Sequence, residues 1–79
     1  MSTKERLQEV FRDVFDDEDI IIDDETTADD IEDWDSLTHV QLVVAVESEF
    51  GVKFSMVETS SLKNVGAFVD LIDKKIREQ

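Results

Sequence analysis

The sequence predicts an all-α fold: a small four-helix bundle with three main helices, one short helix, and a long loop between the first two. Apolar residues recur at helical spacing near both ends of the chain, and side chains suited to helix caps precede the expected helices. The 79 residues include no cysteine, so the fold must depend on helix packing rather than on disulfides or thiolate metal sites. We expect residues 1–79 to form a single domain.

The first helix is expected to begin near Thr3 and to end by Asp16, where four consecutive acidic residues start. Ser2 and Glu5 have the spacing of a capping box, in which each side chain bonds the backbone N–H of the other residue. The apolar residues fall on one stripe of this helix: Leu7, Val10, Phe11, Val14 and Phe15.

Residues 16–35 form a long acidic loop, which we expect its own apolar residues to pin to the core. These are the isoleucines at 20–22, Ile31 and Trp34. A short buried strand at 20–22 is an alternative, although no partner strand is evident. The acidic part of the loop lacks the glycine of an EF-hand calcium loop, so we expect diffuse cation binding and no dedicated metal site.

Residues 36–50 admit two interpretations. Their β-branched residues would suit a buried strand with a hairpin return just after it. A helix is favoured, because Leu42, Val46 and Phe50 share a helical stripe and Gly51 fits the position just after a helix end.

The same helix would carry a second apolar stripe, formed by Leu37, Val40 and Val44. On a small domain, exposed apolar side chains beside an acid such as Glu47 indicate a docking surface for another protein. If the helix instead lies at the centre of the bundle, both stripes are buried. The pattern alone leaves both possibilities open.

A short helix is expected after Ser55, which has the capping-box spacing to Glu58, and a final helix after Asn64. Basic residues in the last turns of the final helix complement its dipole. Its apolar residues lie on one face: Val65, Phe68, Val69, Ile72 and Ile76.

Charge restricts the possible partners. Twenty-one acidic and eight basic residues leave a net charge of −13. Lysine and arginine clusters for phosphate contacts are absent, so we expect no nucleic acid partner. The acidic balance favours partner proteins with basic docking patches. No apolar run approaches the ~20 residues that span a bilayer, and we expect a cytoplasmic monomer.

Ser36 stands where the acidic loop meets the expected helix. Its hydroxyl either helps to cap that helix or, at the positive end of the helix dipole, carries a phosphate group. Asp35 also fits the N-cap. His39 follows by three residues, but a serine hydrolase would further need an orienting group and an oxyanion site, so we expect His39 to be a surface residue.

Two groups of residues resemble the acyl carrier proteins. One is Trp34-Asp35-Ser36-Leu37 with the following Val40-Gln41-Leu42-Val43, and the other is Glu47-Ser48-Glu49-Phe50-Gly51. The similarity covers nearly the whole chain, through Asn64-Val65-Gly66 at the start of the last helix.

The resemblance implies a stand-alone carrier without catalytic activity of its own. A phosphopantetheinyl transferase, using coenzyme A and magnesium, would attach 4′-phosphopantetheine to Ser36, and the terminal thiol of this arm would carry acyl groups as thioesters. Asp35 matches the acid that contributes to transferase recognition. Acyl-loading, condensing and acyl-transferring enzymes would dock on residues that match the family's surface: Leu37, Val40, Val44 and Glu47.

The resemblance also implies that the core between the helices sequesters an acyl chain, lined here by Val43, Val46, Leu62 and Phe68.

Two departures from the common carriers of fatty acid synthesis favour a specialised lipid, polyketide or related pathway. Trp34 replaces a small residue, and the second helix has neutral residues where acids are usual: Thr38, Gln41 and Ser48. An aminoacyl or peptidyl carrier and a non-carrying acidic interaction domain are the alternatives.

Overall fold

The computed structural model describes residues 2–31 and 33–79. Within them lie four α-helices and one 3₁₀ turn: α1 (Thr3–Phe15), η1 (Ala28–Asp30), α2 (Ser36–Phe50), α3 (Met56–Ser60) and α4 (Val65–Arg77). No strand occurs in these two ranges. The predicted all-α fold is confirmed, and both strand alternatives, at 20–22 and at 36–50, are wrong.

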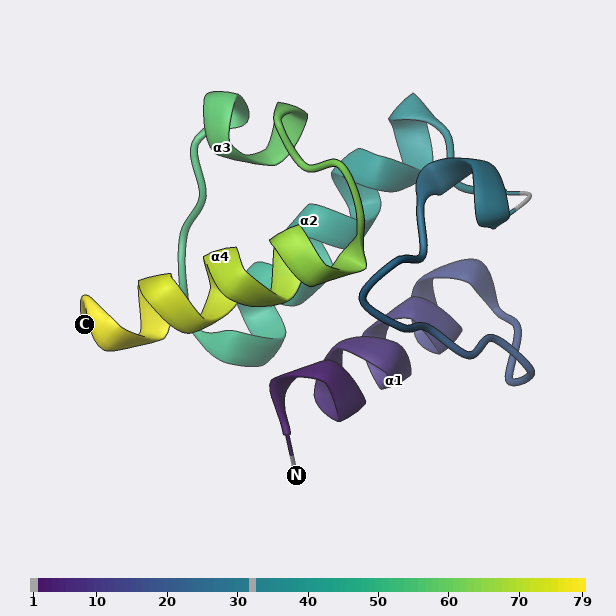
Figure 1. The fold of residues 1–79 in the computed structure, drawn as a ribbon, viewed down its shortest axis with the longest axis horizontal. Helices are drawn as coiled ribbons and strands as arrows, with labels where there is room; N and C mark the ends of the chain where they lie inside the picture. The colour runs from purple at the N-terminus through teal and green to yellow at the C-terminus, as the bar shows by residue number, and fades with distance from the viewer. Residues whose placement is uncertain (1, 32) are drawn as a thin grey trace.

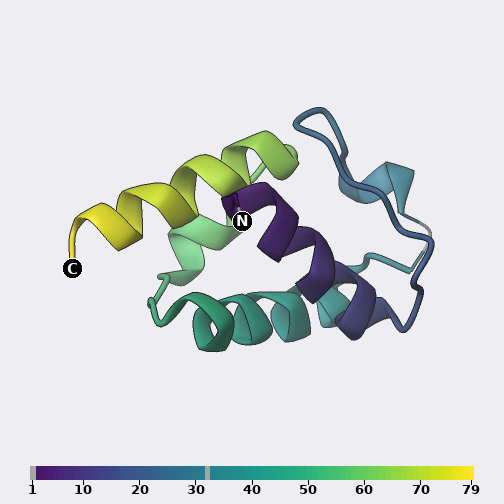
Figure 2. The same ribbon diagram turned by 90° about the horizontal axis from the view of Figure 1, so that it is seen from below.

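The helices are arranged with α2 and α4 between α1 and α3 (Figures 1 and 2). The long loop after α1 runs past the end of the bundle at which α2 begins (Figure 1). The side chains without any solvent exposure come from α1, α2 and α4, which therefore share one core: Leu7, Phe11, Leu42, Val46, Val65, Phe68 and Ile72.

The helix ends follow the local signals in the sequence. The Ser2 hydroxyl accepts a 3.2 Å hydrogen bond from the amide of Glu5, and the Asn64 side chain accepts one of 2.9 Å from Ala67. α1 and α2 both end in a left-handed residue, Asp16 with φ of 51° and Gly51 with φ of 68°. This conformation satisfies carbonyls of the last turn and stops the helix.

The long loop is held by α1 rather than by a partner strand. The amide of Ile22 donates to the side chain of Gln8 at 3.0 Å, and Arg12 Nε donates to the carbonyl of Ile20 at 2.9 Å. Buried backbone groups must be paired, and here α1 side chains pair them.

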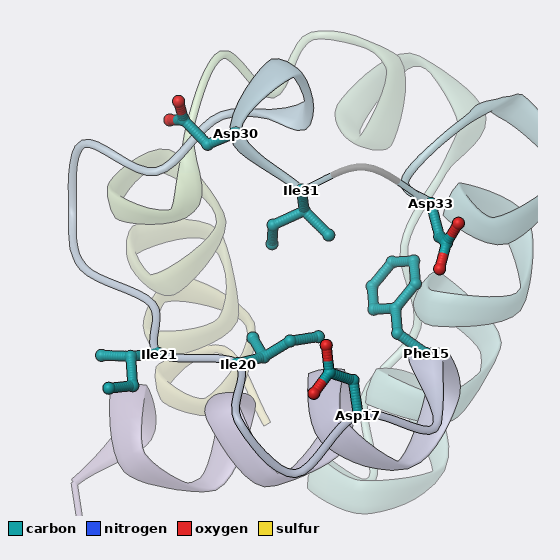
Figure 3. Close-up of a pocket in the computed structure, with 7 residues that line it drawn as sticks. All are labelled: Phe15, Asp17, Ile20, Ile21, Asp30, Ile31 and Asp33. Carbon is teal, nitrogen blue, oxygen red and sulfur yellow. The ribbon is translucent and has the colours of Figure 1, made fainter.

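Only some of the loop's apolar residues anchor it to the core. Ile22 is buried, and Ile20, Ile31 and Trp34 are half-buried against the core. Figure 3 shows Phe15, Ile20 and Ile31 pointing into one pocket, while Ile21 points away from it. Because Ile21 is 79% exposed, the expectation that all three isoleucines anchor the loop is wrong.

No helix in the described part of the chain has the length and apolar character that crossing a bilayer requires.

Candidate functional site

The junction between the loop and α2 is built around Asp35. Its carboxylate accepts a 3.0 Å hydrogen bond from the amide of Thr38, while the Thr38 hydroxyl accepts one of 2.7 Å from the amide of Asp35. The Thr38 hydroxyl in turn donates to the carbonyl of Asp33 at 2.8 Å. This reciprocal pair fixes the angle at which the loop enters the helix.

The sequence interpretation did not give Thr38 a role in the cap of α2. The signal was present, because Asp35 and Thr38 have the three-residue separation of a capping box, although threonine takes the place of the usual glutamate or glutamine. The backbone N–H of Thr38 is the main cause that lowers the pKa of Asp35, and its hydroxyl adds to the effect. Asp35 is therefore a carboxylate at neutral pH.

Ser36 is the first residue of α2, and it is exposed. Asp35 is the N-cap of α2, so the Ser36 side chain is not needed to accept hydrogen bonds from the free amides of the first turn. Hydrogen bonds at the junction involve Asp35, Thr38 and Asp33, and within residues 2–31 and 33–79 none reaches the Ser36 hydroxyl. An available hydroxyl at the positive end of a fifteen-residue helix suits a phosphate ester.

His39 links three segments of the chain, so the expectation that it is simply a surface residue is wrong. Its Nδ1 accepts a 3.1 Å hydrogen bond from the indole Nε1 of Trp34, and its Nε2 lies 3.1 Å from the carbonyl oxygen of Thr59 in α3. The two rings are stacked with centroids 6.0 Å apart. Since both ring nitrogens are engaged, His39 has none free to act as a base toward Ser36, which counts against the hydrolase interpretation.

A groove of about 620 Å³ lies beside Ser36, between the start of α2 and α3. It is lined by residues from the loop, α2, α3 and the α3–α4 connection: Ala28, Trp34, Asp35, Ser36, His39, Met56, Thr59, Ser60, Leu62 and Lys63.

The second apolar stripe of α2 is exposed, which answers the question that the sequence left open. Leu37, Val40 and Val44 expose 68%, 60% and 58% of their surfaces. Glu47 is half-buried, and its carboxylate accepts a 2.8 Å hydrogen bond from the amide of Phe54. Glu47 therefore holds the segment after α2 in place, in addition to any contact with a partner.

The comparisons with known proteins agree with this geometry. The family described as phosphopantetheine attachment site matches residues 5–72. The chain is also similar to the solution structure of a holo acyl carrier protein from Geobacter metallireducens, with 46% sequence identity and a TM-score of 0.92. That similarity covers 99% of this chain and 90% of the other.

This chain belongs to the acyl carrier protein family. Among curated proteins, none matches it. Carriers of this family are not catalysts themselves; other enzymes modify them and use them. The carrier takes a covalently attached 4′-phosphopantetheine, and it interacts with a phosphopantetheinyl transferase and with acyl-handling enzymes.

The residues of this carrier fit that group. Ser36 offers an exposed hydroxyl at a helix N-terminus, and the adjacent groove is of a size typical of small-ligand sites, roughly 300–1,000 Å³. When bound, the group supplies a thiol, which this cysteine-free chain lacks. Within the described ranges no three His, Cys, Asp or Glu residues are placed to hold a metal ion.

Proposed function

We propose that this carrier receives 4′-phosphopantetheine on Ser36 and then holds acyl groups as thioesters for enzymes of a specialised lipid, polyketide or related pathway. The observation that carries the proposal is the exposed Ser36 hydroxyl, without a hydrogen-bond partner in the described ranges, at the start of α2. Asp35 and Thr38 fix the backbone on either side of it.

In the attachment step, Ser36 Oγ forms a bond to the phosphorus of the pantetheine phosphate. The bond between that phosphorus and the nucleotide half of coenzyme A breaks, and the hydroxyl proton leaves to a base. The transferase supplies this base, because the ring nitrogens of His39 are both engaged by Trp34 and Thr59. The role of this chain is to present the hydroxyl at a fixed position.

Docking of the partner enzymes is proposed to use the exposed stripe of Leu37, Val40 and Val44, with Glu47 beside it. From residue 13 to residue 52 the chain has no lysine or arginine. An apolar stripe within so acidic a region complements partner surfaces that combine apolar residues with basic patches.

Support for a specialised pathway comes from the residues that depart from the common carriers. Trp34 hydrogen-bonds His39, and Thr38 completes the cap of α2. Trp34 and Thr38 are thus part of the structure around Ser36, where a partner enzyme and the cargo would be recognised.

The test is incubation of the apo protein with coenzyme A, magnesium and a transferase of broad specificity. We expect the mass of the wild type to increase by one phosphopantetheine, and Ser36→Ala to abolish the increase. Ser48→Ala is the matched control, since Ser48 is an exposed serine on the same helix. An unmodified wild type would contradict the proposal, and mass spectrometry of the protein from its native host would identify the cargo.

A further inference from the structure

Attachment of the arm at Ser36 adds a negative charge to an acidic part of the chain. The hydroxyl is neutral, whereas the phosphodiester that replaces it carries one negative charge. The neighbouring Asp35 is already a carboxylate, since the backbone N–H of Thr38 lowers its pKa. From residue 13 to residue 52 the chain has no lysine or arginine, so no base close in sequence offsets the new charge.

The fold brings one base to this place from a distant segment. Lys63 lies in the connection between α3 and α4, and it lines the same groove as Ser36. Of the other residues that line this groove, only Asp35 and His39 have side chains that ionise near neutral pH. An imidazole that accepts a hydrogen bond at Nδ1 is neutral, and His39 accepts one there from Trp34. Lys63 is therefore the cation of the groove.

The ammonium group of Lys63 is available to a new acceptor. Lys63 is exposed, and within residues 2–31 and 33–79 it forms no ion pair. Its three N–H donors can therefore turn to an anion in the groove. Four other bases are already paired: Lys4 with Asp24, Arg6 with Glu49, Arg12 with Glu9, and Lys75 with Glu58 at 2.8 Å.

The backbone next to Lys63 is held in place. Asn64 caps α4 by accepting a 2.9 Å hydrogen bond from the amide of Ala67, and the amide of Val65 donates to the carbonyl of Thr26 in the long loop at 2.8 Å. These bonds fix the α3–α4 connection to both the loop and α4. Only the flexible four-carbon stem of Lys63 has to move for its ammonium group to meet a phosphate in the groove.

Carboxylates on the other side of Lys63 compete weakly for it. A second groove there is lined by Lys63 together with Asp24, Glu25 and Asp70. Asp24 is paired with Lys4 at 3.8 Å, and none of these three acids pairs with Lys63 in the part of the chain that the structure describes. A phosphate tethered to Ser36 would instead remain at a high effective concentration beside Lys63.

We propose that Lys63 binds the phosphodiester of the 4′-phosphopantetheine arm, its Nζ donating a charge-assisted hydrogen bond to a phosphate oxygen. The N-terminus of α2 and Lys63 then both offset the new charge. The contact exists only in the modified protein, and it draws the base of the arm toward the α3–α4 connection. This inference rests on the proposed attachment at Ser36.

A thermodynamic cycle tests the contact without any partner enzyme in the measurement. Wild type and Lys63→Gln are each prepared as apo protein and as holo protein, and urea denaturation gives the unfolding constant of every form. We expect the ratio of the holo to the apo constant to be about twofold to fivefold larger in Lys63→Gln than in wild type, the range for an exposed ion pair. Lys63→Arg keeps the charge and should behave like wild type.

Lys53→Gln is the matched control. Lys53 is also exposed and forms no ion pair with the described residues, but it follows the opposite end of α2. Because both variants lose one positive charge, a general effect of net charge would change their ratios equally, and that result would overturn the inference. The difference between them should disappear in about 1 M salt, which screens exposed charges.

The ³¹P NMR signal of the arm gives a direct readout. We expect it to shift in holo Lys63→Gln relative to holo wild type and to stay in place in holo Lys53→Gln, and an identical signal in all three would overturn the inference. Mass spectrometry of the same samples separates the two proposals. A gain of one phosphopantetheine with an unchanged cycle would overturn the role of Lys63 alone. A missing gain would overturn the attachment at Ser36, and the role of Lys63 with it.

Discussion

The amide of Gly66 donates a 2.9 Å hydrogen bond to the carbonyl oxygen of Asp24, and a Cβ added to Gly66 would lie 2.9 Å from that same oxygen. The neighbouring amide of Val65 donates to the carbonyl of Thr26 at 2.8 Å. These bonds join the acidic loop to the first turn of α4. The loop that leads to Ser36 is thus anchored on the helix that closes the core.

Gly66→Ala is expected to destabilise the carrier by about 1–3 kcal/mol, because the loop backbone must move away from the new methyl group. Urea denaturation measures the change. Gly51→Ala is the comparison. Nothing lies within 4 Å of its added Cβ, so this variant should lose about 1–2 kcal/mol of stability from its positive φ alone. Faster amide exchange around Asp24 is expected in Gly66→Ala alone, and a variant as stable as the wild type would refute the contact.

Asp16 is expected to limit the stability of α1. It adopts a left-handed conformation with φ of 51°, and its negative charge lies at the helix end that favours cations. Asp16→Asn should raise the free energy of unfolding by about 0.5 kcal/mol by removing the charge, since asparagine tolerates the conformation. Asp16→Gly should add roughly another 0.5 kcal/mol by relieving the backbone. A lower melting temperature in either variant would contradict this account.

Asp35 both caps α2 and carries a negative charge, and two variants separate these two contributions. Asp35→Ala should cost about 1 kcal/mol of stability because the amide of Thr38 loses its acceptor. Asp35→Asn should keep most of that stability and remove only the charge. If the charge contributes to transferase recognition, both variants will be modified more slowly than the wild type. Equal modification rates for Asp35→Asn and wild type would limit Asp35 to its capping role.

The Glu58–Lys75 pair is expected to make stability depend on pH in the acidic range. The hydrogen bond from Lys75 is the main cause that lowers the pKa of Glu58 from 4.5 to about 2, with the amide of Ser55 adding to it. Because the folded pKa is the lower one, the stabilisation is fully present above pH 4.5 and is lost as the pH falls toward 2.

Glu58→Gln should remove that dependence, which thermal unfolding from neutral pH down to about pH 2 can measure. Glu25→Gln controls for the loss of one charge, since Glu25 is exposed and forms no ion pair with any residue in the described ranges. Parallel pH profiles for Glu58→Gln and wild type would show that the pair does not stabilise α3.

Val44→Ser is expected to weaken docking without weakening the fold. Because Val44 is 58% exposed on the proposed docking stripe, the melting temperature of the variant should change little. The rate of acyl loading by a partner enzyme should fall severalfold, through a weaker complex. Ile21→Ser is the matched control, because Ile21 is an exposed apolar residue of the long loop and lies outside the stripe. Equal losses in both variants would show that the stripe has no special role.

The sequence by itself determined the helices and their ends. Ser2 with Glu5, Ser55 with Glu58, and Asn64 act on amides three residues away, so their effects are local and can be read along the chain. It also identified Ser36 as the candidate attachment site, because the flanking residues carry the family's pattern.

Only the tertiary structure decided the contacts between distant segments. The stripe of Leu37, Val40 and Val44 was equally compatible with a buried and an exposed position, and the packing of α2 left it exposed. His39 bonds Thr59, twenty residues further along the chain, and no local signal predicts that partner. Such contacts depend on how the helices pack around a shared core, which the periodicity of each helix alone does not specify.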